Sequence, residues 1–455
     1  MKRAITIAIT IIFLISFFSQ PSAAFAQGGM TYTSGFQLQN LDETNVANVT
    51  IAFYDEAGTI VATVNDTIVP HTNKTYFPLN AVSTGFKGSV VVSSDQQLAS
   101  ITNVLTSDQK GGDAYAGFNQ GATTIKLPLL MKNNYGISTW FNVQNIGNSL
   151  ADVTVNYTGG SCTETASIPA GASHTFDQSI NSCLPSGYVG GGTVTSANNI
   201  VVVVMQIVSG KPTTLAYPGF STTSTTFLAP LISSNYYNSG TSINVQNSGS
   251  ISTDVTISYT PNPGFPGNVC TETKTIPAGA TVIFGFPQLP IACGTKSGTG
   301  VTDTVNGAFV GSASVINNST DQPLTAIVNT ITRGTASGSA YAAFNPATGT
   351  SKLSFPLIMD RNYGIFTGMS ITNVGTQPTT VNCSFSGSTR TISQTIDPGK
   401  GFTDDAINKF TAGYVGAAFC NATGGDAKIA GIVNELVTGA PTTNDALYTY
   451  SGINY

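Results

Sequence analysis

Residues 141–157 read FNVQNIGNSLADVTVNY, and this stretch decides the fold. Its second half, residues 152–157, alternates polar residues with Val153, Val155 and Tyr157. A period of two is typical of a β-strand with one buried face. The Asn-Ile-Gly sequence before the alternation is a turn signal. The stretch therefore predicts two strands joined by a tight turn.

The same stretch recurs along the chain and begins at Phe36, Phe141, Ile243 and Met369. Each copy holds an asparagine at the same place, namely Asn40, Asn145, Asn247 and Asn373. An Ile-Pro-Ala-Gly-like turn, a Gly-aromatic strand, an apolar strand and a closing segment follow each copy in constant order. The closing segments read AYAGF, AYPGF, AYAAF and LYTYSG. Self-similarity in fixed order indicates tandem copies of one structural unit.

The repeats divide the chain into a leader and four units of ordinary domain size. The leader is residues 1–26, and units 1 to 4 are residues 27–122, 123–224, 225–348 and 349–455. Inside each unit, short alternating runs are broken by Gly, Pro and Asn turns, a pattern typical of β-sandwiches. We therefore expect an all-β protein of four tandem sandwiches, held as a rod by short junctions.

The order V-x-N-x-G, V-x-V-x-Y and I-P-A-G is present at residues 143–147, 153–157 and 168–171. This pattern resembles the immunoglobulin-like repeats of bacterial secreted and surface proteins, of the cell-adhesion-related type. The resemblance covers all four units. It implies four tandem immunoglobulin-like β-sandwich domains, and it implies no particular activity.

The composition excludes several classes of protein. Only 9% of the 455 residues are charged and the net charge is −5, whereas an ordinary soluble domain is about 25% charged. Nucleic-acid binding needs a basic excess that is absent here. Disorder driven by charge does not fit a chain that is 41% apolar.

The leader is typical of a secretory signal peptide. Lys2 and Arg3 precede an uncharged apolar stretch, residues 4–18, and Ala24-Phe25-Ala26 matches an A-x-A cleavage site. The apolar stretch is short for a membrane span, which needs about 20 residues. We expect cleavage after Ala26, no membrane span after cleavage, and a secreted or cell-surface location.

Six cysteines occur in pairs in units 2, 3 and 4. In an exported chain, two cysteines per unit predict one disulfide within each unit. The expected pairs are Cys162–Cys183, Cys270–Cys293 and Cys383–Cys420. The third pair is placed differently, because Cys383 is expected to replace the strand tyrosine of unit 2, Tyr157. No C-x-x-C or histidine spacing typical of a metal site is present.

The sequence holds no motif for catalysis. It lacks a G-x-S-x-G elbow, an H-E-x-x-H helix, a Walker loop and a strand-linked G-x-G-x-x-G. His71 and His174 lie in or near turns. We therefore expect no catalytic residue, no metal site and no cofactor.

Four aromatic residues are candidates for ligand binding or for packing. Trp140 is the only tryptophan, and Tyr135, Tyr236 and Tyr363 recur at the junctions between units. Recurrence favours packing between units over a platform for sugars.

A junction strand precedes units 2, 3 and 4 and reads LPLLM, LAPLI and FPLIM. Unit 1 has no such strand after the predicted cleavage site. If the junction strand completes the following unit, unit 1 has an unpaired edge that can dock a partner or another copy.

The expected function is a non-enzymatic extracellular structural or interaction protein, such as a spacer, an adhesin-like protein or an envelope component. Its expected partners are other extracellular proteins, surface glycans or copies of itself. A carbohydrate- or matrix-binding protein and a secreted hydrolase remain as alternatives.

Overall fold

A computed structural model describes residues 26–27 and 30–455, and in this part of the chain the protein is almost entirely β-structure. The only helical elements in the described residues are two short 3₁₀ turns, η1 (Ile291–Cys293) and η2 (Pro346–Thr348), and turns and loops join the strands. The predicted signal peptide lies outside the described residues except for Ala26. The all-β prediction is confirmed for the described residues.

Unit 2 shows the arrangement most completely. Its strands are β9 (Ala122–Lys132), β10 (Ile137–Asn145), β11 (Ala151–Tyr157), β12 (Thr163–Ile168), β13 (Ser173–Asp177), β14 (Tyr188–Val208) and β15 (Thr214–Pro218). The first half of β14 pairs with β11 and β9, and its second half pairs with β10 and β15. The long strand β14 therefore runs through both layers of the unit.

Units 3 and 4 repeat this plan with separate strands in place of β14. Unit 3 consists of β16 (Thr226–Tyr236), β17 (Ser239–Asn247), β18 (Thr253–Pro261), β19 (Cys270–Ile276), β20 (Thr281–Phe284), β21 (Phe309–Asn317), β22 (Leu324–Thr332) and β23 (Gly338–Ala342). Unit 4 consists of β24 (Lys352–Asp360), β25 (Ile365–Asn373), β26 (Thr379–Phe385), β27 (Thr391–Ile396), β28 (Gly401–Asp405), β29 (Tyr414–Thr423), β30 (Ile429–Val437), β31 (Leu447–Ser451) and β32 (Ile453–Asn454).

Unit 1 has one layer of β4, β3 and β6 and a second layer of β5, β2, β7 and β8, with β1 also paired to β2. The strands are β1 (Ala26–Gln27), β2 (Met30–Asn40), β3 (Ala47–Asp55), β4 (Ile60–Ile68), β5 (Asn73–Tyr76), β6 (Gly88–Ser94), β7 (Leu98–Thr106) and β8 (Gly112–Ala116). All described pairings between these strands are antiparallel.

The alternation in the opening stretch produces the core of each unit. In β11 every second residue is buried, and Val153, Val155 and Tyr157 are 1%, 0% and 4% exposed. Residues of this face pack against the facing layer to form one apolar core. The period-two prediction is therefore confirmed for this strand.

The repeated asparagine fixes the turn of each unit. The Asn145 side chain donates to the backbone carbonyls of Ser149 (2.7 Å) and Ile168 (2.9 Å) and accepts from the Gly147 N–H (2.9 Å). The other units make the same three bonds through Asn40, Asn247 and Asn373. The asparagine side chain gives these backbone groups hydrogen-bond partners. It thereby connects the turn to the last residue of the strand that precedes the Pro-Ala-Gly turn, which is Ile168 in unit 2.

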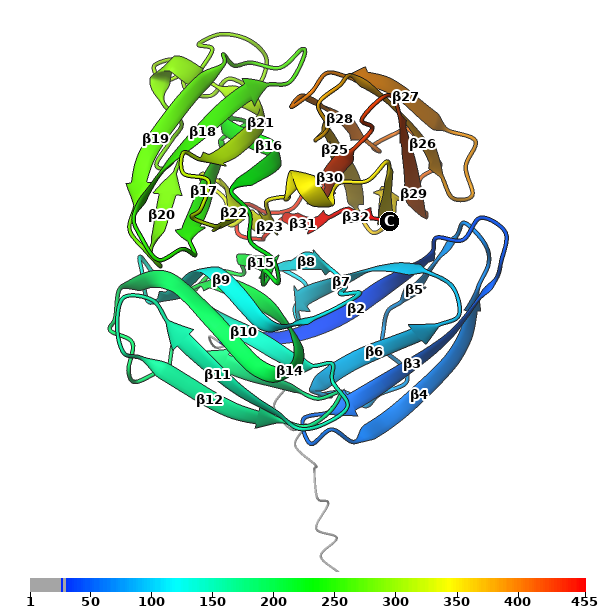
Figure 1. Cartoon of the computed structure of the whole chain (residues 1–455). Helices are drawn as coiled ribbons and strands as arrows, with labels where there is room; N and C mark the ends of the chain where they lie inside the picture. The colour runs from blue at the N-terminus through cyan, green and yellow to red at the C-terminus, as the bar shows by residue number, and fades with distance from the viewer. Residues whose placement is uncertain (1–25, 28–29) are drawn as a thin grey trace, which may run out of the picture.

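The four units form a closed ring, as Figure 1 shows, with β8, β15, β23 and β31 at its centre. These four closing strands contact one another in a cycle, so unit 4 meets unit 1. The rod expected from the short junctions is therefore wrong. The physical reason is that each closing strand packs its buried residues against two other units rather than against solvent.

The junction strands complete the units that follow them, as the sequence predicts. β9 pairs with β14, β16 with β21, and β24 with β29. Each of these first strands also packs on the next unit around the ring: β9 on β17 and β22, β16 on β25 and β30, and β24 on β2 and β7. One strand therefore serves both the core of its own unit and a ring interface.

All three predicted disulfides are present, and the described residues include no free cysteine. Cys383 and Cys420 face each other on the neighbouring strands β26 and β29. The expected place of Cys383 is wrong by two residues, because Phe385 stands at the position of Tyr157 and Cys383 at that of Val155. The bridge thus replaces an apolar cross-strand pair, Val155 and Val194 in unit 2.

Candidate functional site

A tyrosine in each closing strand holds the first strand of units 2, 3 and 4. The hydroxyl of Tyr341 accepts from the Leu231 N–H at 3.3 Å and donates to the Leu231 carbonyl at 2.6 Å. Tyr217 makes the same two bonds to Leu129, and Tyr450 makes them to Leu357. These three tyrosines are 0–3% exposed. One hydroxyl therefore satisfies a peptide group that the first strand would otherwise bury unpaired.

A proline directly precedes each of these leucines, at Pro128, Pro230 and Pro356. Proline has no N–H to donate, and the strand register shifts at this point in all three units. The proline carbonyl then serves the next unit: Pro128 accepts from Thr281 Oγ1 at 2.5 Å, and Pro356 accepts from the side chain of Gln37.

Unit 1 lacks this first strand within residues 26–27 and 30–455. There, β3 is the only strand that pairs with β6, so the outer edge of β6 is open. A groove of about 1130 Å³ occupies the place of the strand, and we call it the unit 1 groove. Apolar residues of both layers line it, including Phe36, Leu38, Val90 and Val92.

The far wall of the unit 1 groove belongs to unit 2. Asn142, Gln144, Val201 and Val203 line it from β10 and β14. The residues that line the groove include no Asp, Glu, Lys, Arg or His. The groove therefore combines an open sheet edge with an uncharged surface.

The ring centre holds a second group of functional interest, which we call the axial cluster: Asp113, Asp445 and the backbone groups bound to them. Four equivalent N–H groups of the closing strands converge on Asp113, those of Ala114 (2.9 Å), Ala216 (2.6 Å), Ala340 (3.1 Å) and Thr449 (2.7 Å). The Ser339 hydroxyl adds a fifth bond at 2.6 Å. One carboxyl group thus joins all four units.

Asp445 extends the axial cluster. It accepts from the N–H groups of Thr214 (3.1 Å), Gly338 (3.0 Å) and Leu447 (3.3 Å), which belong to three units. Burial raises the pKa of Asp113 to about 8, although the hydrogen bonds from Ser339 and the backbone act to lower it. Burial also raises the pKa of Asp445. The two carboxyl groups accept hydrogen bonds from backbone N–H groups of different units and from the Ser339 hydroxyl. The axial cluster therefore links the units of the ring.

A buried side-chain pair joins each of two ring interfaces. Between units 2 and 3, Gln206 and Asn329 exchange two bonds, at 2.7 and 3.1 Å. Between units 4 and 1, Asn103 donates to Glu435 at 2.8 Å, while Glu435 Oε1 and Asn103 Oδ1 have no partner. Burial raises the pKa of Glu435 to about 7. A proton on Oε1 supplies the donor that the two oxygens lack.

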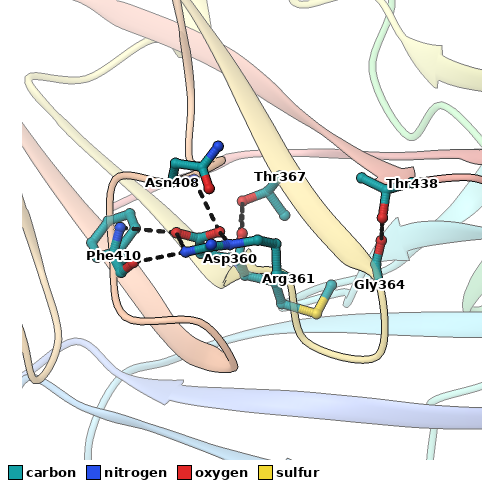
Figure 2. Close-up of polar contacts among 8 residues, drawn as sticks. Asp360, Arg361, Gly364, Thr367, Asn408, Phe410 and Thr438 are labelled. Atoms are coloured by element: carbon teal, nitrogen blue, oxygen red, sulfur yellow. Dashed lines mark hydrogen bonds and ion pairs between the residues drawn. The ribbon is translucent and has the colours of Figure 1, made fainter.

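Asp360 is a buried acidic group with a structural task, as Figure 2 shows. It pairs with Arg361 at 2.7 Å and accepts from the N–H groups of Asn408 (3.2 Å) and Phe410 (2.9 Å). Although burial acts to raise it, these bonds hold the pKa of Asp360 below its usual value. In unit 2, Lys132 stands at the same strand end and donates to the carbonyls of Asn181 and Leu184. Both side chains thus fix a loop through its backbone groups.

The two histidines lie in separate environments and each packs on an aromatic ring. The His71 ring packs on Phe419, with 3.5 Å between centroids, beside the ion pair of Lys352 and Glu43. Burial lowers the pKa of His71 and of His174. Among the described residues, no group of three His, Cys, Asp or Glu side chains has the placement of a metal site.

The structure separates the four candidate aromatic residues. Trp140 is 7% exposed and meets Tyr32 of unit 1 edge-on at 5.9 Å. Tyr135 and Tyr363 are 97% and 95% exposed, because they lie at hairpin ends with positive φ. Tyr236 packs edge-on against Tyr237 and Phe265. Packing between units therefore involves Trp140, whereas Tyr135 and Tyr363 point into solvent.

Sequence reasoning missed Tyr115, Asp113, Asp445 and Glu435. The Ala-Tyr pair that recurs in the closing segments of units 1, 2 and 3 was the one available signal. It marks Tyr115 and the clamping residues Tyr217 and Tyr341, whereas the clamping Tyr450 of unit 4 follows a threonine. The carboxyl groups had no signal, because none of them recurs in the other units.

A comparison with models of protein families gave no match, and no characterised protein matched the chain significantly. Over the described residues, no helix has the length and apolar character needed to cross a membrane.

Proposed function

We propose that this protein is a secreted, non-enzymatic structural and interaction protein, built from four immunoglobulin-like β-sandwich domains. Its ring acts as a rigid body that presents the unit 1 groove to extracellular partners. The groove is the observation that carries this proposal, because it combines an unpaired strand edge with an uncharged surface of mixed polar and apolar residues.

Three further features support an extracellular structural role. The signal-like leader directs export. The disulfides suit an oxidising compartment. The buried acidic groups with raised pKa values are engaged in contacts between units, so they are explained without catalysis.

Fractionation of the native host, combined with thiol titration, tests the proposal. We expect the protein in the medium or at the cell surface, with cleavage after Ala26. We also expect six reactive thiols only after reduction and unfolding. Recovery from the cytoplasm with six free thiols would contradict it.

A second candidate, binding to carbohydrate or matrix, is favoured by the exposed tyrosines. Tyr135 and Tyr363 end equivalent hairpins and present their ring faces to solvent, where rings can stack on sugars. Glycan-array binding that disappears in Tyr135→Ala and Tyr363→Ala but persists in Trp140→Phe would support this candidate.

A further inference from the structure

We propose that the unit 1 groove binds an extended β-strand of another protein, with the pattern apolar-x-apolar-Pro-Leu-apolar, which completes unit 1. The inference rests on the proposed interaction function and names the class of its ligand. Units 2, 3 and 4 show what the groove is shaped to hold.

The first argument is the open edge of β6. The strands equivalent to β6 pair with a first strand in the other units: β14 with β9, β21 with β16, and β29 with β24. An open edge presents unpaired N–H and C=O groups, which an added strand satisfies.

The second argument is Tyr115. It stands on β8 at the position of Tyr217, Tyr341 and Tyr450, as the strand registers show. Those three tyrosines clamp the peptide group of a leucine in the first strand. Tyr115 lines the unit 1 groove and is partly exposed. Unit 1 therefore has a tyrosine at the clamping position, where its side chain contacts Thr102, whereas the strand to be clamped is not among the described residues.

The third argument lies across the groove, on unit 2. Asn142 and Gln144 are partly exposed there. Their equivalents behind a first strand are 0–2% exposed, and they are Gln37 and Gln39 in unit 1, Asn244 and Gln246 in unit 3, and Ser370 and Thr372 in unit 4. Among the described residues, β10 of unit 2 is therefore the only strand of its kind that no first strand of a neighbouring unit covers.

The chemistry of the ligand follows from the three strands that fill equivalent sites. They read Ile-x-Leu-Pro-Leu-Leu from Ile125, Phe-x-Ala-Pro-Leu-Ile from Phe227, and Leu-x-Phe-Pro-Leu-Ile from Leu353. The proline permits the register shift, and the carbonyls of Pro128 and Pro356 accept hydrogen bonds from the next unit. Ser173 of unit 2 occupies the position that Thr281 occupies in unit 3, and Thr281 donates a hydrogen bond to the Pro128 carbonyl. A charged residue in the middle of the ligand would be buried without a partner, because the lining carries no charge.

The strand comes from another protein rather than from a second copy. In this chain, β9, β16 and β24 are each held by two neighbours and a tyrosine clamp. A second copy could donate one of them only by opening a completed unit.

The first test uses the secreted full-length chain and a fluorescent synthetic peptide copying residues 351–361, SKLSFPLIMDR. We expect saturable binding by fluorescence anisotropy. Tyr115→Phe should weaken this binding about tenfold, because it removes two hydrogen bonds to the peptide. Tyr237→Phe, at an exposed site of unit 3 outside the groove, serves as the matched control and should bind as the wild type does.

A peptide with Leu357→Asp should bind at least about 100-fold more weakly, because it buries an unpaired charge. If Tyr115→Phe fails to fold, Gln144→Ala tests the unit 2 wall instead and should also weaken binding. A further variant carries residues 351–364 fused before Met30, so that the chain supplies its own strand. This variant should not bind the peptide and should melt at a higher temperature than the wild type.

Three outcomes would overturn the inference. The first is no binding of the peptide at 1 mM (roughly the limit of weak association) to a folded, disulfide-bonded chain. The second is equal binding of the Leu357→Asp peptide. The third is a dimer by light scattering that the fused strand abolishes, which identifies a second copy as the occupant. The first two leave the proposed secreted structural role standing, whereas cytoplasmic recovery removes that role even if the peptide binds.

Discussion

Unit 1 and units 2 to 4 share the same asparagine turn and strand order, but they differ in one strand. Where β9, β16 and β24 are present, the core extends into the next unit of the ring. Unit 1 instead has a small separate core of Phe36, Leu38, Ala47, Val49, Ile51, Phe53 and Ile68. The comparison teaches that the first strand is a separable part, which contributes to one unit and seals the interface with the next.

Unit 1 lacks a first strand among the described residues, yet it supplies the residue that joins all four units. Asp113 stands on β8 of unit 1, at the position of Leu215, Ser339 and Tyr448. Unit 1 is thus the least complete unit at its outer edge and the most connected one at the axis.

The largest expected effect concerns Asp113. Asp113→Ala leaves the four converging N–H groups without an acceptor, and we expect a loss of about 5 kcal/mol in the free energy of unfolding. Urea titration followed by tryptophan fluorescence measures this loss. Glu56→Gln, which removes only an exposed ion pair with Lys87 in the same unit, is the control and should leave the midpoint nearly unchanged. Equal midpoints for Asp113→Ala and wild type would show that the axis does not hold the ring.

The disulfide of unit 4 gives the next effect. Replacing Cys383 and Cys420 by alanine should cost roughly 4 kcal/mol, because it frees a loop spanning 37 residues. Unit 4 should then exchange its amide hydrogens as rapidly as unit 1, which has no disulfide. Hydrogen exchange with mass spectrometry checks this, and unchanged protection of β26 and β29 would contradict it.

Glu435 gives a pH-dependent effect. Its pKa is raised in the folded state, so its contribution is full below the unfolded pKa and is lost as the pH rises from about 4.5 to 7. We expect Glu435 to lower the unfolding free energy by about 3 kcal/mol over this range, and the raised pKa values of Asp113 and Asp445 add to that fall. Glu435→Gln can form the two-bond pair seen between Gln206 and Asn329, so it should remove this part of the pH dependence. A variant that keeps the full dependence would assign it to other groups.

The smallest effect comes from matched tyrosine variants. Tyr341→Phe should destabilise the protein by about 1–2 kcal/mol, because it leaves the peptide group of Leu231 unpaired. Tyr115→Phe should cost much less in the absence of a bound strand. Thermal melts of both variants measure the difference, and equal costs would mean that the Tyr115 clamp is already engaged.

The sequence predicted the parts of the fold that depend on local pattern. Alternation at Val153 and Val155, repetition of Asn145 and pairing of cysteines are each visible within about a hundred residues. The ring was not predictable from these signals. The partners of Asp113 lie 103, 227 and 336 residues away at Ala216, Ala340 and Thr449.

The candidate site was predicted only in outline. The missing junction strand indicated an open edge in unit 1, and the structure adds the groove and the tyrosine clamp. The role of Tyr115 depends on a hydroxyl that reaches across layers, which a one-dimensional pattern does not encode. Likewise, Tyr135 and Tyr363 recur because their hairpins recur, and recurrence alone did not indicate the side on which their rings lie.

The hydrogen bond from the Thr449 N–H to Asp113 also determines when the ring can close during folding. During synthesis from the amino end, Asp113 is made long before Thr449. Until then the carboxyl lacks its last backbone donor, and the ring stays open at the seam between units 1 and 4. Ring closure therefore depends on a contact across 336 residues of chain, and contacts of such long range form slowly in folding.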